Sequence, residues 1–318
     1  MKSISLGKHG LIVPAVGLGC MGMSEFYGEH NQKDNLSVLN RSIELGCTFW
    51  DTADIYGPFT NEVLLGKALA GQRDKITLAT KFGISRNEQG DWLGTNGHPD
   101  YVKASCEASL KRLNTDYIDV YYQHRIDPNV PIEDTVGAMA DLVKEGKVRY
   151  LGLSEAEPEQ IKRAHKIHPI SVLQTEYSLW SRDVETNILP ITRELGIGFV
   201  AYSPMGRGFL SGSIKQRSDL EAGDWRLDNP RFQREAIEKN KALINKISLI
   251  SASKGVSSAQ ISLAWLLAQG EDVAIIPGTK RVPYLEQNWA SMEVKLSTKE
   301  LATLTQLSDK YTVVGSRY

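Results

Sequence analysis

The feature that most restricts the fold is an eightfold alternation of short apolar segments with segments of helical pattern. The apolar segments are rich in Val, Ile, Leu and Tyr, and they occupy residues 13–19, 48–51, 76–81, 117–124, 150–154, 172–177, 198–203 and 273–277. Most are almost continuously apolar, as expected for parallel strands that are covered on both faces. Eight such strands separated by helices favour an α/β fold of the (β/α)8 TIM-barrel type over an open sheet.

Proline and glycine mark the ends of the expected helices. Pro99, Pro131 and Pro158 each open a helical pattern, whereas Gly46 and Gly146 each follow the end of one. Proline fits the first helical turn because its missing N–H has no partner there, and glycine fits the position just after a helix because it adopts a positive φ. These residues support the helix assignments between the strands.

Two segments lie outside the alternation. Residues 3–8 and 11–14 are typical of the strands of an N-terminal β-hairpin, joined through His9 and Gly10, and residues 297–300 form a capping box that opens a last helix. No linker rich in Pro, Ser or Gly divides the sequence. We therefore expect a single barrel domain over residues 1–318.

Two connections are too long to be simple turns. Residues 82–98 follow the third strand, and residues 204–230, rich in Gly, Arg and Asp, follow the seventh. In barrels, long loops at the carboxyl ends of strands usually carry function, so both are expected on the top face. The C-terminal residues 311–318 are a candidate third element there.

Composition excludes several classes of protein. The formal net charge is −1 over 318 residues, with no long basic or acidic block, so electrostatics gives no reason to expect a nucleic acid or an anionic membrane as partner. The N-terminus lacks the apolar core of a signal peptide, and the longest apolar stretch, residues 261–268, is far too short to span a bilayer. Cys20, Cys47 and Cys106 show no CxxC spacing, which indicates reduced thiols and a cytoplasmic protein.

Ionisable residues stand at the ends of three successive strands. The second strand ends at Asp51, with Tyr56 five residues later; the third ends at Lys81 and the fourth at His124. Chemistry in a barrel takes place where the strands end, so these four side chains are the candidate catalytic residues. The alternative is a purely structural polar network, which is credible for each residue alone but much less so for all four together.

The four residue types suit the reduction of a carbonyl group, which needs a hydride for the carbon and a proton for the oxygen. A tyrosine such as Tyr56 is a suitable acid, and a nearby lysine ammonium is expected to lower its pKa below the usual value of about 10. Asp51 can supply the counter-charge that a buried Lys81 requires. A neutral His124 can hydrogen-bond the carbonyl oxygen and fix its position.

The same segments resemble the signature segments of the aldo-keto reductases. They are GCTFWDTADIYG, TLATKFG, YIDVYYQHRID, YLGLSEA, LQTEYSLW, AYSPMGRGFL and IIPGTKR, and the resemblance covers residues 2–310. The branch most similar includes plant perakine reductase and the pyridoxal-reductase-like enzymes of bacteria and yeast. The resemblance implies that Asp51, Tyr56, Lys81 and His124 form a catalytic tetrad, with Tyr56 as proton donor. It also implies that NADPH binds extended across the barrel mouth.

The resemblance further implies a set of residues along the cofactor. Ser154 and Gln174 would hydrogen-bond the nicotinamide carboxamide, and Tyr202 would stack on the nicotinamide ring. The remaining positions follow the pyrophosphate (Ser203, Gly206, Gly208, Leu210), hold the 2′-phosphate (Gly278, Thr279, Lys280, with Arg281 nearby) and face the adenine (Gln287, Asn288). A buried core amide and ordinary strand packing are the alternatives for Gln174 and Tyr202, and the glycines after the seventh strand fit simple turns equally well.

Two positions depart from the family pattern. Glu155 stands where many members have asparagine beside the carboxamide, although a Ser-Glu pair suits the branch named above. Tyr284 stands where some members have an arginine against the adenine or its phosphate. The second departure puts the strength of the 2′-phosphate contact in question.

Two apparent motifs are discounted. Residues 17–22 match GxGxxG after a strand, but a Rossmann site needs a helix to begin at once, and the next helix is expected only near Gln32. His165 and His168 lie three apart on an expected helix without supporting carboxylates or cysteines, so a solvated helix face is favoured and no metal site is expected.

The sequence therefore predicts an NADPH-dependent reductase of aldehydes or ketones. The alternatives are a nucleotide-binding regulatory subunit on the same barrel, like the potassium-channel β-subunits, and a Rossmann dehydrogenase, which the strand pattern disfavours. Aldehydes, pyridoxal-like aromatic aldehydes and bulky ketones all stay open as substrates. The sequence does not indicate an oligomeric state, and the five loop residues Trp92, Arg125, Asp127, Trp180 and Trp225 fit either pocket lining or loop packing.

Overall fold

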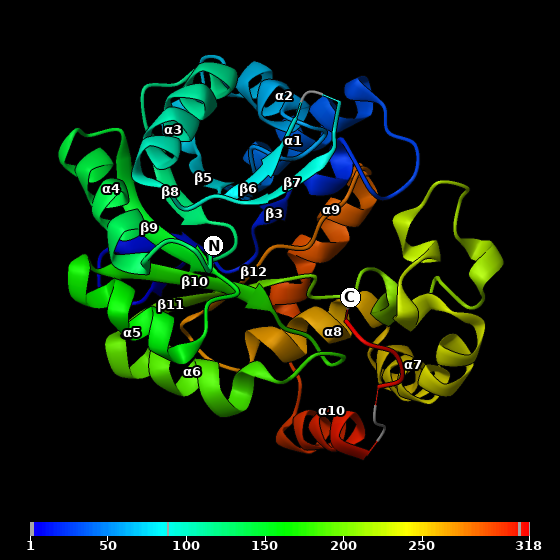
Figure 1. The fold of residues 1–318 in the computed structure, drawn as a ribbon. Coiled ribbons are helices and arrows are strands. Elements are labelled where there is room, and N and C mark those ends of the chain that lie inside the picture. The colour runs from blue at the N-terminus through cyan, green and yellow to red at the C-terminus, as the bar shows by residue number, and fades with distance from the viewer. Residues whose placement is uncertain (1–2, 88, 311–312, 318) are drawn as a thin grey trace.

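The computed structural model describes residues 3–87, 89–310 and 313–317. Its centre is an eight-stranded parallel sheet surrounded by helices (Figure 1). The strands are β3 (Leu18–Gly19), β4 (Phe49–Asp51), β5 (Thr77–Phe82), β8 (Ile118–Gln123), β9 (Val148–Ser154), β10 (Ile170–Glu176), β11 (Gly198–Tyr202) and β12 (Val273–Ile275). The predicted α/β barrel is thus confirmed, with bounds that differ by a few residues.

The sheet closes on itself. Its strand order is β12-β11-β10-β9-β8-β5-β4-β3, and two parallel bridges, Val16 with Ile275 and Gly19 with Gly278, join the first strand to the last. The prediction of a first barrel strand over residues 13–19 is wrong in length. Residues 11–14 form the second strand of the N-terminal hairpin instead. Only Leu18 and Gly19 run alongside β4.

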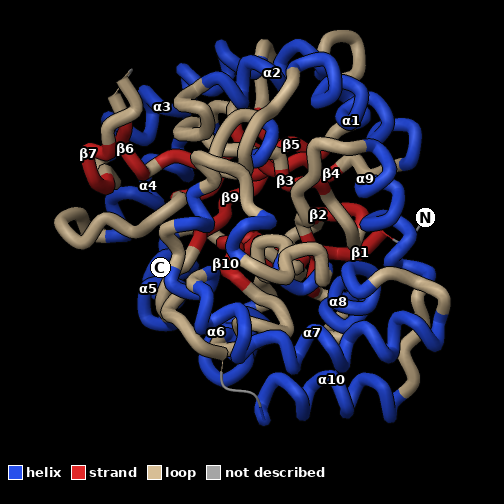
Figure 2. The backbone as a smooth tube through the Cα atoms, turned by 90° about the vertical axis from the view of Figure 1, so that its right-hand side faces the viewer, coloured by secondary structure: helices blue, strands red, loops and turns tan. Residues whose placement is uncertain are grey.

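Eight helices form an outer layer around the strands (Figure 2). They are α1 (Gln32–Leu45), α2 (Thr60–Leu69), α3 (Pro99–Leu113), α4 (Ile132–Lys144), α5 (Pro158–Ile167), α6 (Val184–Leu195), α8 (Ser258–Leu267) and α9 (Val282–Trp289). Two more, α7 (Arg234–Lys254) and α10 (Thr298–Lys310), pack outside, with α7 against α8 and α10 against α7. Among the described residues, none of the helices combines the length and apolarity that a bilayer span requires.

The helix ends follow the sequence signals closely. Gly46 adopts φ 86° after α1, and Pro99 and Pro158 are the first residues of α3 and α5. Pro131 is the residue before α4 rather than its first residue, since its ψ of 131° is extended. The side chains of Ser297 and Glu300 bond each other's backbone N–H at the start of α10, as the capping box predicts.

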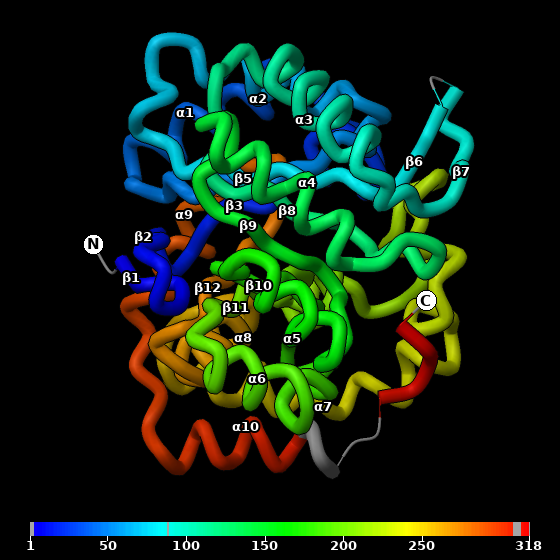
Figure 3. Tube along the Cα trace, turned by 60° about the vertical axis from the view of Figure 1, so that its left-hand side comes forward, coloured from blue at the N-terminus to red at the C-terminus, as the bar shows by residue number. Residues whose placement is uncertain are grey.

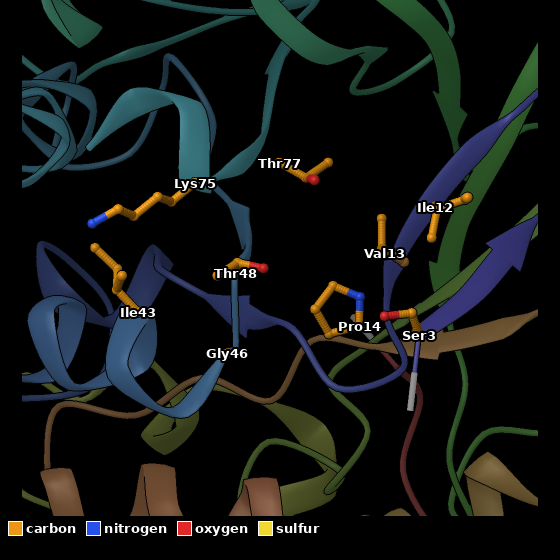
Figure 4. Close-up of a pocket in the computed structure, with 9 residues that line it drawn as sticks. All are labelled: Ser3, Ile12, Val13, Pro14, Ile43, Gly46, Thr48, Lys75 and Thr77. Atoms are coloured by element: carbon orange, nitrogen blue, oxygen red, sulfur yellow. The ribbon is translucent and has the colours of Figure 1, made fainter. Parts of the chain in front are cut away.

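The N-terminal hairpin covers the bottom of the barrel. Strands β1 (Ser3–Leu6) and β2 (Leu11–Pro14) pair antiparallel, and Gly7 forms a bridge with Ile197 at the start of β11. Figure 3 shows this hairpin and the C-terminal tail at opposite sides of the molecule. Beside the hairpin lies a cavity of about 340 Å³, lined by residues that include Ser3, Thr48 and Thr77 (Figure 4). Because these residues precede or begin their strands, the cavity lies at the end opposite the strand ends that carry Asp51 and Lys81.

The two long connections on the top face contain local structure. Residues 82–98 were expected as a loop, but they form an antiparallel hairpin of β6 (Ile84–Arg86) and β7 (Trp92–Thr95). The segment after β11 is built from short 3-10 helices: η3 (Phe209–Ser211), η4 (Arg217–Asp219), η5 (Trp225–Leu227) and η6 (Pro230–Phe232). Both connections are therefore held in defined shapes beside the barrel mouth.

Part of the C-terminal tail also lies on the top face. Residues 311, 312 and 318 lie outside the described part of the chain. Asn240 of α7 and Val314 exchange two hydrogen bonds, of 3.1 and 3.2 Å, and the Arg317 carbonyl accepts from Arg207 and Asn229. The tail is thereby attached to α7 and to the segment after β11.

Candidate active site

The alternation of side chains along the strands places the candidate catalytic residues inside the barrel mouth. Phe49 of β4, Ala79 of β5 and Val172 of β10 belong to the apolar cluster within the barrel. The residue two positions further along each strand faces the same way. Those residues are Asp51, Lys81 and Gln174, which therefore lie in one layer above the apolar cluster.

The centre of this layer is a buried ion pair. Lys81 is 0% exposed and Asp51 is 3% exposed. The Lys81 ammonium donates to Asp51 Oδ1 and, at 2.8 Å, to the carbonyl of Thr52, while Gln174 Nε2 donates to Asp51 Oδ2 at 2.7 Å. Both carboxylate oxygens of Asp51 thus have a donor, which is what a charged carboxylate in a dry site requires.

Tyr56 and His124 complete the group. Tyr56 lies in the turn after β4, with its ring centroid 5.3 Å from Lys81 Nζ, and His124 directly follows β8. The two rings meet edge to face, with centroids 5.9 Å apart and an interplanar angle of 84°. Each side chain is 7% exposed. The structure therefore brings all four residues together at the barrel mouth.

The pKa of Tyr56 differs from the expectation. Burial raises it above the usual value near 10, and although the charge of Lys81 lowers it, this effect does not outweigh burial. The expected net depression of the pKa is therefore wrong. For Lys81, burial favours the neutral amine, but the Asp51 carboxylate and the Tyr56 hydroxyl reverse this and raise its pKa. The proton consequently stays on the lysine.

His124 is held as a neutral imidazole. Its backbone N–H donates to the Phe82 carbonyl at 2.7 Å, which ties the end of β8 to β5. Burial, the charge of Lys81 and the charge of Arg125 lower its pKa well below 6.5. Among the described residues its buried Nδ1 has no hydrogen-bond partner. A neutral ring can donate to, or accept from, a group placed beside Tyr56.

A glycine shapes the barrel interior next to this group. A Cβ on Gly152 of β9 would lie 2.4 Å from the ring of Tyr122, so only glycine leaves room for that ring. The Tyr122 ring centroid in turn lies 5.9 Å from Lys81 Nζ. Lys81 is thus flanked by two tyrosine rings as well as by Asp51, which restricts its side chain to one position.

Ser154, Gln174 and Tyr202, the three residues expected at the nicotinamide, lie at or near the ends of neighbouring strands. Ser154 ends β9 and is 1% exposed, with its hydroxyl accepting from Arg125 Nη1 at 3.3 Å. Gln174 of β10 is occupied on its Nε2 side by Asp51. Because an amide oxygen only accepts, Gln174 presents an acceptor, Oε1, for any further partner. Tyr202 ends β11 and is partly buried.

The turn after β11 runs through three consecutive positive φ values. Gly206, Arg207 and Gly208 have φ of 54°, 57° and 93°. A Cβ on Gly206 would lie 2.5 Å from the Trp180 ring, so this glycine is required by packing. Ser203 also has a positive φ, 48°. The side chain of Leu210 lies in the hydrophobic core, which leaves only its backbone for a ligand.

The expected phosphate turn follows β12. Gly278 is exposed, Thr279 Oγ1 accepts from the Arg281 backbone N–H at 3.1 Å, and Arg281 precedes α9. Lys280 is engaged elsewhere: its ammonium donates to the carbonyl of Tyr27 at 2.6 Å and to that of Glu29. On α9, Gln287 is partly buried and Asn288 is 4% exposed.

The segment between β3 and α1 crosses toward the segment after β11. The Phe26 carbonyl accepts from the Trp225 N–H at 3.3 Å, and the Arg226 guanidinium lies 4.9 Å from the centre of the Tyr27 ring. This segment begins with a short 3-10 helix at Met21, and α1 begins only at Gln32, so no α-helix starts directly after the GxGxxG match. Its contact with Lys280 joins residues more than 250 positions apart, which no local sequence signal reports.

An ion-pair cluster that no sequence pattern indicates follows the ends of β9 and β10. Glu176, 0% exposed, pairs with Arg207 at 2.9 Å and with Arg231 at 3.4 Å. Glu155, with φ 54°, accepts from the Glu176 N–H and pairs with Arg317 of the C-terminal tail. Glu155 therefore does not point freely at the expected carboxamide position. Within the described part of the chain, no group of three or more His, Cys, Asp or Glu side chains is arranged to hold a metal ion.

Comparison with known proteins identifies the family. Residues 15–309 match the aldo/keto reductase family. The chain is 47% identical to the probable aldo-keto reductase 1 of Glycine max, over 100% of this chain and 92% of the relative. A thermostable aldo-keto reductase solved with the inhibitor epalrestat is 30% identical, with TM-score 0.79 over 96% of this chain and 100% of that one.

Two further structures resemble the chain. An aldo/keto reductase of Klebsiella pneumoniae, in complex with NADP and acetate, is 28% identical with TM-score 0.74, over 98% of this chain and 96% of that one. The glycerol dehydrogenase of Gluconobacter oxydans is 24% identical with TM-score 0.88, over 99% of this chain and 97% of that one. At that identity the second likeness supports the fold alone.

The buried ion pair leads to a stability prediction. Asp51→Asn leaves the Lys81 ammonium without a counter-charge, and removing one partner of a buried pair typically costs about 3–5 kcal/mol. We expect the free energy of unfolding, measured by urea denaturation with circular dichroism, to fall by roughly that amount. Asp141→Asn is the control, because Asp141 pairs with Lys103 on the surface and its loss should leave the midpoint nearly unchanged. Equal small effects in both variants would contradict the role given to Asp51.

Proposed function

The chain belongs to the aldo/keto reductase family, and we propose that it reduces aldehydes or ketones to alcohols by hydride transfer from NADPH, with Tyr56 as the proton donor. The observation that carries the proposal is the contact of Tyr56 with both Lys81 and a neutral His124 at the barrel mouth. An acid, a cation that stabilises its conjugate base, and a neutral hydrogen-bonding group are the parts that carbonyl reduction needs.

The side chains around the mouth suit an extended dinucleotide. Ser154 and the Gln174 oxygen offer a donor and an acceptor that match a carboxamide. In the turn after β11, the partly exposed Ser203 and Gly208 would face a pyrophosphate. Thr279 and Arg281 lie beyond the end of β12, the strand that pairs with β11, and Arg281 directly precedes α9. When bound there, NADPH would supply the hydride.

The roles of the protein residues follow from their protonation states. His124 and the Tyr56 hydroxyl would hydrogen-bond the carbonyl oxygen and so fix the position of the carbon. Tyr56 gives its proton to that oxygen, and the Lys81 ammonium stabilises the phenolate that results. Asp51 keeps Lys81 charged and in place through each cycle.

The Tyr56 hydroxyl is the proposed source of the proton. Tyr56→Phe removes the transferable proton but keeps the ring, so reduction of an aldehyde such as benzaldehyde should fall at least about a hundredfold. NADPH affinity, measured by tryptophan fluorescence quenching, should stay within a few-fold. Tyr150→Phe is the control, because that hydroxyl bonds the Gly10 carbonyl at the bottom of the barrel. Near-normal turnover in Tyr56→Phe would refute the assignment, and NADPH binding with no turnover in the unmodified protein would favour a regulatory subunit.

The pH dependence follows from the raised pKa of Tyr56. Reduction uses the neutral phenol, so its rate should persist through neutral pH and fall only at pH values above the usual tyrosine range. Alcohol oxidation uses the phenolate and should still be rising at about pH 10. Lys81→Met removes the main group that lowers this pKa. The fall of the reduction rate and the rise of the oxidation rate should therefore both move to higher pH. An oxidation rate that levels off below about pH 8 would contradict the raised pKa of Tyr56.

Cofactor preference should depend on the turn after β12. Arg281 is exposed at the start of α9, so Arg281→Ala should raise the NADPH dissociation constant roughly tenfold through loss of one charged phosphate contact. The dissociation constant for NADH should change little, since NADH lacks the 2′-phosphate. Lys280→Ala should weaken both cofactors, because Lys280 also holds the carbonyls of Tyr27 and Glu29. Equal effects of Arg281→Ala on NADPH and NADH would place the phosphate elsewhere.

A further inference from the structure

Arg125 is a charged side chain beside the reacting groups to which the mechanism above assigns no role. It directly follows His124, and its Nη1 donates to the His124 carbonyl at 2.7 Å and to the Ser154 hydroxyl at 3.3 Å. These two contacts place the guanidinium between the ends of β8 and β9, and the side chain is partly buried. Arg125 therefore borders both the expected carbonyl position and the expected nicotinamide position.

The electrostatic influence of Arg125 reaches both groups that would hold the carbonyl oxygen. After burial and the charge of Lys81, the Arg125 charge is a further contribution that lowers the pKa of His124, and it also lowers the pKa of Tyr56. A guanidinium stays protonated at every pH of interest. Lys81, paired with Asp51, is the other cation near these two groups, and Arg125 occupies a different position in the same site.

From this position we propose that Arg125 binds a carboxylate of the substrate, so that the enzyme prefers carbonyl compounds carrying a carboxylate over uncharged ones. The proposal rests on the proposed reductase function and names the substrate class for the same site. A guanidinium binds a carboxylate through two parallel N–H···O bonds, which gives direction as well as attraction. A carboxylate held there would orient the carbonyl group of the same molecule relative to Tyr56 and His124.

The test compares benzaldehyde with 2-carboxybenzaldehyde and 4-carboxybenzaldehyde, following NADPH oxidation. The measured quantity is the ratio of kcat/KM for the better carboxylated aldehyde to that for benzaldehyde. Because the intrinsic reactivity of each aldehyde is the same for every variant, it cancels when ratios are compared between proteins. In Arg125→Met we expect the ratio to fall at least about tenfold, mainly through a higher KM for the carboxylated aldehyde.

Four further measurements separate substrate binding from a general defect. Arg125→Lys keeps the positive charge but lacks the planar guanidinium that can form two parallel hydrogen bonds. It should retain part of the preference for the carboxylated aldehyde. Arg163→Met is the control, because Arg163 pairs with Glu133 on the outer helices and should leave the ratio unchanged. The NADPH dissociation constant of Arg125→Met should stay within a few-fold of that of the unmodified protein, and the ratio of the unmodified protein should fall as salt increases.

The outcomes are distinct. A ratio that is the same in Arg125→Met and in the unmodified protein would overturn the assignment of Arg125 while leaving the reductase function intact. Loss of NADPH affinity in Arg125→Met, with the ratio unchanged, would overturn it in favour of a cofactor contact. If the unmodified protein reduced none of the three aldehydes under conditions where NADPH binds, both this inference and the proposed function would fall.

Discussion

The ion pair of Lys81 and Asp51 is the interaction on which the site depends. Taking an ammonium group fully out of water costs several kcal/mol, and this cost is met only if its charge and its N–H groups have partners. Asp51 and the Thr52 carbonyl provide them, and Gln174 supplies the second donor that Asp51 needs. Three strands, β4, β5 and β10, are thereby joined at one level of the barrel.

That arrangement also explains why Tyr56 is suited to act as an acid without being ionised beforehand. Burial keeps its phenol neutral, so the proton is available over a wide range of pH. The charge of Lys81 becomes more valuable once the proton has left, because the phenolate then has a cation beside it. Lys81 therefore leaves the phenol of Tyr56 neutral before the reaction, and it stabilises the phenolate that forms after proton transfer.

The loops above the strands add a second level of organisation. The segment between β3 and α1 contacts Trp225 and Arg226 beyond β11 and is held by Lys280 beyond β12. A side chain expected to bind only phosphate thus has a structural partner as well. The cluster around Glu176 joins the C-terminal tail to the barrel in a comparable way through Arg207, Arg231 and Arg317.

The barrel and the grouping of Asp51, Lys81 and His124 follow from the amino-acid sequence, because parallel strands share one carboxyl edge and their side chains alternate with a period of two. It also determined most helix ends, since proline and glycine act through local backbone conformation. The folded chain was needed to find the raised pKa of Tyr56, the hydrogen bond from Gln174 to Asp51 and the partners of Lys280. Each of these depends on burial or on contact between residues far apart in the chain, and neither quantity is encoded in local periodicity or spacing.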